Sequence, residues 1–140
     1  MSSRIKHNKK DIETLARLIK SEALGEGNYG MLLVGNVAVN RVVYRCNPFK
    51  NISSIKRVVY QPGNFLGVNT KLFNAPVNGK IKDLSKKNIR YWRADPAYNA
   101  LYFQNPGKGK PCKNRFWGQF AGKYKNHCFY NPDKIEGCGL

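Results

Sequence analysis

Residues 12–27, IETLARLIKSEALGEG, decide how this chain is expected to fold. Apolar residues recur in this stretch with the i, i+3, i+4, i+7 spacing of a core-facing helix surface. The members of this stripe are Ile12, Leu15, Ala16, Ile19 and Ala23. Asn8 is a candidate N-cap with Asp11 at the third helical position, and Gly25 and Gly27 follow the last turn. We therefore expect an amphipathic helix that starts after Asn8 and runs roughly to Leu24.

Glu22 lies on the same apolar stripe, where a carboxylate is unexpected. Apolar surroundings disfavour the ionised form, so we predict that the pKa of Glu22 is raised. A raised pKa lets a carboxyl group carry a proton at neutral pH and act as a general acid. The structural alternative is a partly buried glutamate paired with one of the many Lys and Arg residues. Glu26, four residues later, is a second candidate carboxylate.

The composition favours one folded domain with a strongly basic surface. Hydrophobic residues make up 41% of the 140 residues, which argues against wholesale disorder. We expect a single domain over residues 1–140, with a flexible basic tail over residues 1–8. The formal net charge of +17 indicates a polyanionic partner, such as nucleic acid, a membrane surface or an anionic wall polymer. No apolar run is long enough to cross a membrane, and residues 1–10 lack the features of a secretory signal.

The cysteines and histidines do not suggest a metal site. The four cysteines are Cys46, Cys112, Cys128 and Cys138. None of them shows C-x-x-C spacing, which argues against zinc. They permit three disulfide connectivities, and free buried thiols are an equal alternative. With only His7 and His127 besides, we expect no metal site and no cofactor, and we leave calcium dependence open.

A second helix is expected over residues 30–44. It is apolar nearly all round, which is typical of a buried central helix. Its polar residues Asn36, Asn40 and Arg41 then need partners, and Arg41 could pair with Glu26 or Asp95. The remaining expected elements are a helix over 55–60, a loop over 67–81, a helix over 83–93, a strand over 100–104, a loop over 105–113 and a strand over 127–130. The predicted fold class is α+β, mainly helical with a small antiparallel sheet.

Several segments, in order along nearly the whole chain, resemble the SleB/CwlJ family of cell-wall hydrolases, and more its CwlJ branch. They are Leu15-Ala16-Arg17, Glu22-Ala23-x-Gly25-Glu26, residues 34–41 (VGNVAVNR), Val59-Tyr60-Gln61-Pro62-Gly63-x-Phe65, residues 100–106 (ALYFQNP) and residues 126–130 (NHCFY). The chain departs from the family pattern at Leu24, where Arg is common, and at Asn64, where Gln is common.

The resemblance implies a domain similar to lysozyme-like lytic transglycosylases that acts on spore-cortex peptidoglycan during germination. It implies that Glu22 is the catalytic acid, the residue that the helix pattern also singles out. Glu22 could act alone in a lytic transglycosylase reaction, or with Glu26 or Asp95 in a two-carboxylate hydrolysis. Because no second acid occupies a matching apolar position, we favour the single-glutamate route.

A glycan cleft needs amide and hydroxyl groups together with aromatic faces. The candidate substrate-binding residues are Glu26, Gln61, Phe65, Tyr102, Gln104, His127 and Tyr130. Packing in the core is the alternative for each ring. On the strand over 100–104 the polar residues alternate with Leu101 and Phe103, and we expect the polar set to line the cleft.

The resemblance also implies partners and a location. The expected partners are peptidoglycan glycan strands and a spore-coat anchoring protein. Without a signal peptide, the enzyme is expected to be made in the mother cell and deposited in the outer spore layers. A phage lysin is an alternative. A nucleic-acid-binding module built on residues 91–93 (YWR) and 115–117 (RFW) is another, but the Glu22–Glu26 pair would repel phosphate, so we expect neither nucleic-acid binding nor membrane insertion.

Overall fold

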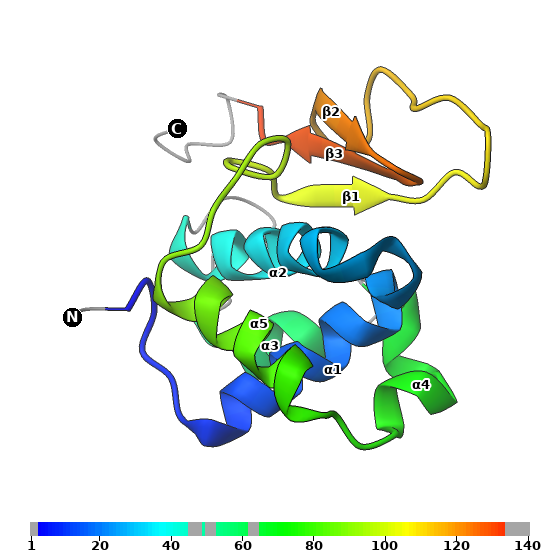
Figure 1. Cartoon of the computed structure of the whole chain (residues 1–140). Coiled ribbons are helices and arrows are strands. Elements are labelled where there is room, and N and C mark those ends of the chain that lie inside the picture. The colour runs from blue at the N-terminus through cyan, green and yellow to red at the C-terminus, as the bar shows by residue number, and fades with distance from the viewer. Residues whose placement is uncertain (1–2, 45–48, 50–52, 62–64, 134–140) are drawn as a thin grey trace.

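The computed structural model describes residues 3–44, 49, 53–61 and 65–133. It has two layers, a group of helices and a small sheet, with one long helix between them (Figure 1). The predicted α+β class with a small antiparallel sheet is confirmed. Within the described residues, no helix is long and apolar enough to span a bilayer.

The elements follow one another with the helices first and the strands last. They are α1 (Lys9–Ala23), η1 (Leu24–Glu26), α2 (Gly27–Val43), α3 (Ile55–Tyr60), η2 (Leu66–Asn69), α4 (Lys71–Asn74), α5 (Gly79–Arg90), β1 (Tyr102–Gln104), β2 (Gln119–Tyr124) and β3 (His127–Asn131).

Helix α1 starts and ends as its sequence predicts. Asn8 accepts a hydrogen bond from the Asp11 backbone N–H at 2.9 Å, and the Asp11 carboxylate accepts one from the Asn8 backbone N–H at 3.0 Å. This capping box satisfies N–H groups that have no partner inside the helix. Leu15 and Ile19 on the apolar stripe are fully buried against the rest of the helical layer. The C-terminus of α1, with Glu22 in its last turn, therefore has a fixed position.

Helix α2 is the central helix, buried from Gly30 to Val42. Its polar side chains find partners in the segment that leads to the sheet. Asn36 accepts from the Ala94 backbone N–H at 3.0 Å, and Asn40 donates to the Ala100 carbonyl at 2.8 Å. These bonds fix the backbone just before β1, because each buried carbonyl or N–H group is costly to leave without a partner.

The three strands form an antiparallel sheet in the order β1-β3-β2. Phe103 pairs with Phe129, and these rings pack toward Leu33 and Val37 of α2. Tyr102 pairs with Tyr130 and belongs to a separate cluster on the other face. The alternation along β1 and β3 thus divides the sheet into an inner face toward α2 and an outer face.

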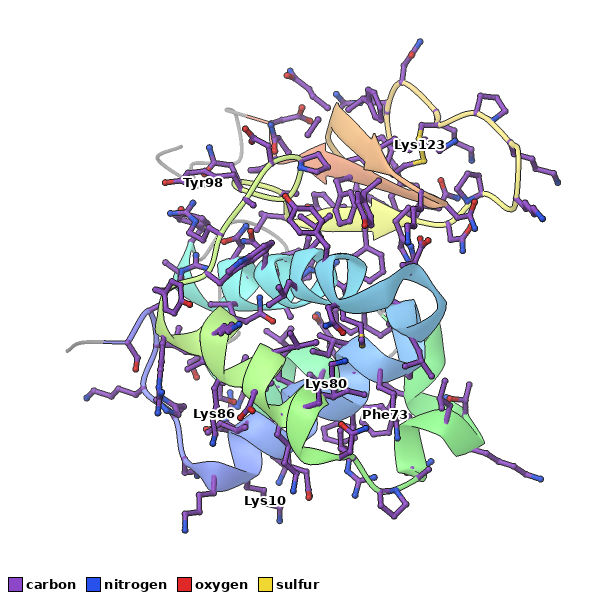
Figure 2. All side chains as sticks on the ribbon, viewed as in Figure 1. Lys10, Phe73, Lys80, Lys86, Tyr98 and Lys123 are labelled. Carbon is purple, nitrogen blue, oxygen red and sulfur yellow. A yellow bond between two sulfur atoms is a disulfide. The ribbon has the colours of Figure 1, made fainter. Side chains whose placement is uncertain are left out.

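A disulfide joins Cys112 to Cys128, one of the pairings that the sequence permits. It ties the long loop between β1 and β2 to the central strand β3, and its yellow bond lies beside the sheet in Figure 2. The predictions for Cys46 and Cys138 concern residues outside the described part of the chain.

Two sequence-based predictions about the fold are wrong. The stretch 67–81 is not a loop, because Thr70 caps α4 and Asn78 caps α5, which begins four residues earlier than expected. The strand β2 was not expected, since Gln119–Tyr124 contains a glycine and a lysine among few apolar residues.

Part of the segment expected to be a flexible basic tail, residues 1–8, contacts the domain. Arg4 donates from its backbone N–H to the Ile89 carbonyl at 2.8 Å and from its guanidinium to Asn40 Oδ1 at 2.7 Å. Ile5 packs against the helical core. The hydrogen bond to the buried Asn40 and the packing of Ile5 together hold residues 4–5 against the domain.

Candidate active site

Glu22 lies half-buried in the last turn of α1. The backbone dipoles of a helix disfavour a negative charge at this end. Arg41 of α2 acts in the opposite direction, because the charges of Glu22 and Arg41 interact favourably. A carboxylate at the end of a helix and a buried cation are therefore brought together from two elements.

Arg41 is almost completely buried in aromatic surroundings. Its Nε donates to the Leu101 carbonyl at 2.7 Å, and its guanidinium carbon lies 4.3 Å from the Phe49 ring centre and 4.7 Å from that of Phe65. Burial lowers the pKa of Arg41 to about 9, while the charges of Tyr102 and Glu22 act to raise it. Arg41 thus remains a cation at neutral pH.

Glu26, the second candidate carboxylate, has a different environment. It is buried, and its carboxylate accepts hydrogen bonds from His127 Nδ1 and from the Asn126 backbone N–H, the latter at 3.2 Å. Lys125 donates to the Glu26 backbone carbonyl at 3.1 Å. Glu26 therefore joins η1 to the turn between β2 and β3, and its oxygens are engaged by the protein itself.

A row of rings connects the two carboxylate sites. The rings of Phe65 and Phe103 are stacked with centres 5.8 Å apart, and the centres of Phe103 and His127 are 5.6 Å apart. Because Arg41 lies over Phe65 and His127 binds Glu26, the row runs from the neighbour of Glu22 to the partner of Glu26. Phe103 was expected to pack in the core; the exposure that it keeps beside His127 is visible only in the fold.

The structure divides the predicted substrate-binding residues between the two faces of the sheet. His127 lies on the inner face beside Phe103. Tyr130 lies on the outer face, is fully buried and donates its hydroxyl to the Lys113 carbonyl at 2.9 Å. Tyr102 is also buried on the outer face, where it packs in the cluster of Phe49 and contacts Arg41. The strand therefore does not bring Tyr102, Tyr130 and His127 together into one wall.

The two predicted amides have acceptors to offer. Gln61 ends α3 and Gln104 ends β1, and both are half-buried. The Oε1 atoms of both side chains are buried without a hydrogen-bond partner in the described part of the chain. A buried acceptor of this kind is satisfied when a water molecule or a ligand donates to it.

Glu26 was one of two partners suggested for Arg41, but it binds His127 instead. Asp95, the other suggested partner, is exposed on the segment before β1. Among the described residues, no group of three or more His, Cys, Asp or Glu side chains could hold a metal ion.

A helical layer capped by a small antiparallel sheet, with a carboxylate at the end of its first helix, defines the lysozyme-like class of wall-lytic domains. The family model described as cell wall hydrolase matches residues 25–130, a span that begins three residues after Glu22. The chain belongs to this cell wall hydrolase family, and the prediction of an enzyme that cleaves glycosidic bonds of the cell wall is confirmed.

Relatives support this membership over most of the chain. The cell wall hydrolase CwlJ of Oceanobacillus iheyensis is 41% identical over 94% of this chain and 94% of its own length. CwlJ of Bacillus subtilis is 37% identical over 87% of this chain and 85% of its own. The spore cortex-lytic enzyme of Oceanobacillus iheyensis matches more weakly, at 29% identity over 71% of this chain and 34% of its own length. The predicted resemblance to the CwlJ branch is confirmed.

Two solved structures have the same fold. The catalytic domain of the germination-specific lytic transglycosylase SleB from Bacillus anthracis has a TM-score of 0.70 at 25% identity, covering 89% of this chain and 97% of that one. The catalytic domain of SleB from Bacillus cereus has a TM-score of 0.72 at 24% identity, covering 94% and 98%.

Proposed function

We propose that this enzyme cleaves the glycan strand of spore-cortex peptidoglycan as a lytic transglycosylase, with Glu22 as its single catalytic carboxylate. The observation that carries the proposal is the environment of Glu26. Both oxygens of Glu26 lie within hydrogen-bonding reach of the Asn126 N–H, and His127 occupies one of them. A carboxylate held in this way is poorly suited to orient a hydrolytic water, which leaves Glu22 at the end of α1.

The other described carboxylates have positions that explain them without catalysis. Asp11 caps α1, Glu13 and Asp83 lie near surface lysines or arginines, Asp133 pairs with Arg115, and Asp95 is exposed. Such surface pairs are ordinary and contribute little to stability. They supply no second carboxylate beside Glu22.

The proposed reaction needs one group and no water. Protonated Glu22 donates its proton to the glycosidic oxygen as the bond from that oxygen to C1 of the muramic residue breaks. The resulting Glu22 carboxylate then removes the proton from the muramic C6 hydroxyl, whose oxygen bonds to C1 and closes a 1,6-anhydro ring. Glu22 regains its proton, so the cycle is complete without a second acid or base. Arg41 stabilises the intermediate carboxylate form, and Gln61 and Gln104 offer acceptors to sugar hydroxyl or acetamido N–H groups.

The charge of the protein suits an anionic wall polymer. Lysines project from both layers, with Lys10 at the start of α1 and Lys123 on β2 both exposed (Figure 2). A net charge of +17 raises the local concentration of the enzyme at a polymer that carries peptide carboxylates. Deposition in the outer spore layers by an anchoring protein stays a prediction from the family resemblance.

The test compares the wild type with Glu22→Gln on purified cortex peptidoglycan in water enriched in oxygen-18, with mass spectrometry of the released fragments. We expect unlabelled anhydro products, lighter by one water, from the wild type and none from Glu22→Gln. Products that carry the label at a reducing end would indicate hydrolysis instead. Undiminished lysis by Glu22→Gln would refute the assignment of the acid, and binding of this variant to the insoluble wall serves as the folding control.

A further inference from the structure

We propose that Glu26 is a positioning residue, which acts through the Nδ1 atom of His127 to hold the β2–β3 turn on the end of α1. The inference rests on the proposed role of Glu22, which precedes Glu26 by four residues. It assigns Glu26 and His127 to the alignment of the site and not to contact with the reacting atoms.

The first support is the set of bonds that converge on Glu26. Its carboxylate accepts from His127 Nδ1 and from the Asn126 N–H, and its backbone carbonyl accepts from Lys125 Nζ. Two residues of the turn and the first residue of β3 thus bind one residue of η1. Glu26 and His127 are both buried, with 6% and 4% of their surface exposed. A buried carboxylate is strongly unfavourable without donors, so η1 and the turn hold each other in register.

The second support is the shape of the contact. A Cβ atom added at Gly30 would lie 2.4 Å from the Glu26 Cβ and 3.5 Å from a ring carbon of Tyr124. The absence of a side chain at Gly30 therefore makes room for Glu26 to reach the turn. The Tyr29 and Tyr124 rings, whose centres are 5.0 Å apart, pack beside this contact. The turn is seated by shape as well as by hydrogen bonds.

The third support is the path from this pair to the surroundings of Glu22. Along the backbone, η1 follows directly from the last turn of α1. Through side chains, the His127 ring contacts Phe103, which stacks on Phe65, over which Arg41 lies. A shift of the turn would therefore move both the residues that follow Glu22 and the ring that packs on its cationic neighbour.

The geometry of the imidazole suggests a sharp pair of variants. An asparagine amide nitrogen is separated from Cβ by the same number of bonds as histidine Nδ1, whereas a glutamine amide nitrogen corresponds to Nε2. His127→Asn can still donate to Glu26, but His127→Gln places its donor one bond too far. If the bond from Nδ1 to Glu26 aligns the site, His127→Asn retains more activity than His127→Gln. If the ring instead contacts the substrate through Nε2, the order reverses.

The experiment measures initial rates on solubilised cortex glycan, together with thermal unfolding and hydrogen–deuterium exchange over residues 124–127. We expect Glu26→Gln and His127→Gln to lower kcat roughly tenfold to a hundredfold, with KM little changed, because a small misplacement of a catalytic group has effects of this size. We expect the turn to exchange faster in both variants. His127→Asn should lie closer to the wild type in rate and in exchange.

Ser85→Ala is the matched control for lost stability. It removes a hydrogen bond from the buried Ser85 hydroxyl to the Ile12 carbonyl, at 2.8 Å, near the opposite end of α1. The proposal is overturned if Glu26→Gln loses no more activity than Ser85→Ala at an equal loss of melting temperature. It is also overturned if His127→Gln matches or exceeds His127→Asn, or if exchange over 124–127 is unchanged. An active Glu22→Gln variant would refute the role of Glu22 as the catalytic acid. The hydrogen–deuterium exchange of residues 124–127 would still test the role of Glu26, because exchange does not depend on turnover.

Discussion

Replacing Asn40 by alanine should destabilise the domain by about 4 kcal/mol, because Asn40 satisfies several buried groups at once. Its amide nitrogen donates to the carbonyls of Ala97, Tyr98 and Ala100, and its Oδ1 accepts from Arg4 and Asn36. The loss of stability depends on how many buried groups are left without any hydrogen-bond partner when the Asn40 side chain is removed.

Two of the three carbonyls keep another donor when the Asn40 side chain is removed. Ala97 O also accepts from the backbone N–H of Ala100, and Tyr98 O accepts from Arg93. Ala100 O has no second donor in the described part of the chain, and the Asn36 amide loses its acceptor, whereas the Arg4 guanidinium keeps a hydrogen bond with Tyr44. Each buried group left without a partner costs about 1–3 kcal/mol. Two such groups at about 2 kcal/mol each give a total of about 4 kcal/mol.

Urea unfolding measures this loss directly. With a denaturant dependence of about 2 kcal/mol per molar urea, the midpoint for Asn40→Ala should fall by about 2 M. Asn78→Ala is the matched control, because Asn78 makes a single cap bond to the Ile81 N–H at 2.9 Å and its loss should cost about 1 kcal/mol. If the urea midpoints of Asn40→Ala and Asn78→Ala are equal, the reasoning is refuted. The loss of stability would then follow from replacing Asn by Ala and not from the number of buried groups left without a partner.

Three further outcomes are expected. Replacing Cys112 and Cys128 by serine should lower stability by about 3 kcal/mol, since their bond closes a loop of 16 residues, and thermal unfolding would measure the loss. Arg41→Met removes a cation that favours ionised Glu22, so the protonated acid persists to higher pH and the alkaline limb of the pH–activity profile should move upward. Arg4→Met is the control for that shift, because burial also lowers the pKa of Arg4, to about 10, with no contribution from Glu22. Binding to cortex peptidoglycan should weaken as salt is raised, because salt screens the attraction between a net charge of +17 and an anionic polymer. Co-sedimentation with the insoluble wall would measure the affinity, and an affinity that does not change with salt would contradict this expectation.

Local sequence signals predicted the elements whose stability is local. The capping box of Asn8 and Asp11 and the apolar stripe placed α1 to within a residue at each end. Helix α2 was expected from Gly30 and starts at Gly27, because η1 continues directly into it. The stretch 67–81 was misjudged because its many Asn and Gly residues include helix caps, which look like loop residues when read alone.

The sequence pointed to individual candidate site residues but not to the contacts between them. Glu22 stood out because a carboxylate interrupts an apolar stripe, and that signal lies within one helix. The partnership of Glu26 with His127 joins residues 101 positions apart, and no periodicity connects them. Tyr130 was grouped with His127 as a candidate substrate-binding residue. The register of β1 and β3 places them on opposite faces instead.

The same separation in sequence has a consequence for the time at which the enzyme becomes competent. During synthesis, α1 and η1 leave the ribosome about a hundred residues before the turn that binds Glu26. Contacts this distant in sequence form after local ones, since the chain between them must first be closed into a loop. A nascent chain that already displays Glu22 therefore still lacks the donors that hold η1 in place. The order of translation therefore delays the assembly of a site that cleaves the cell wall.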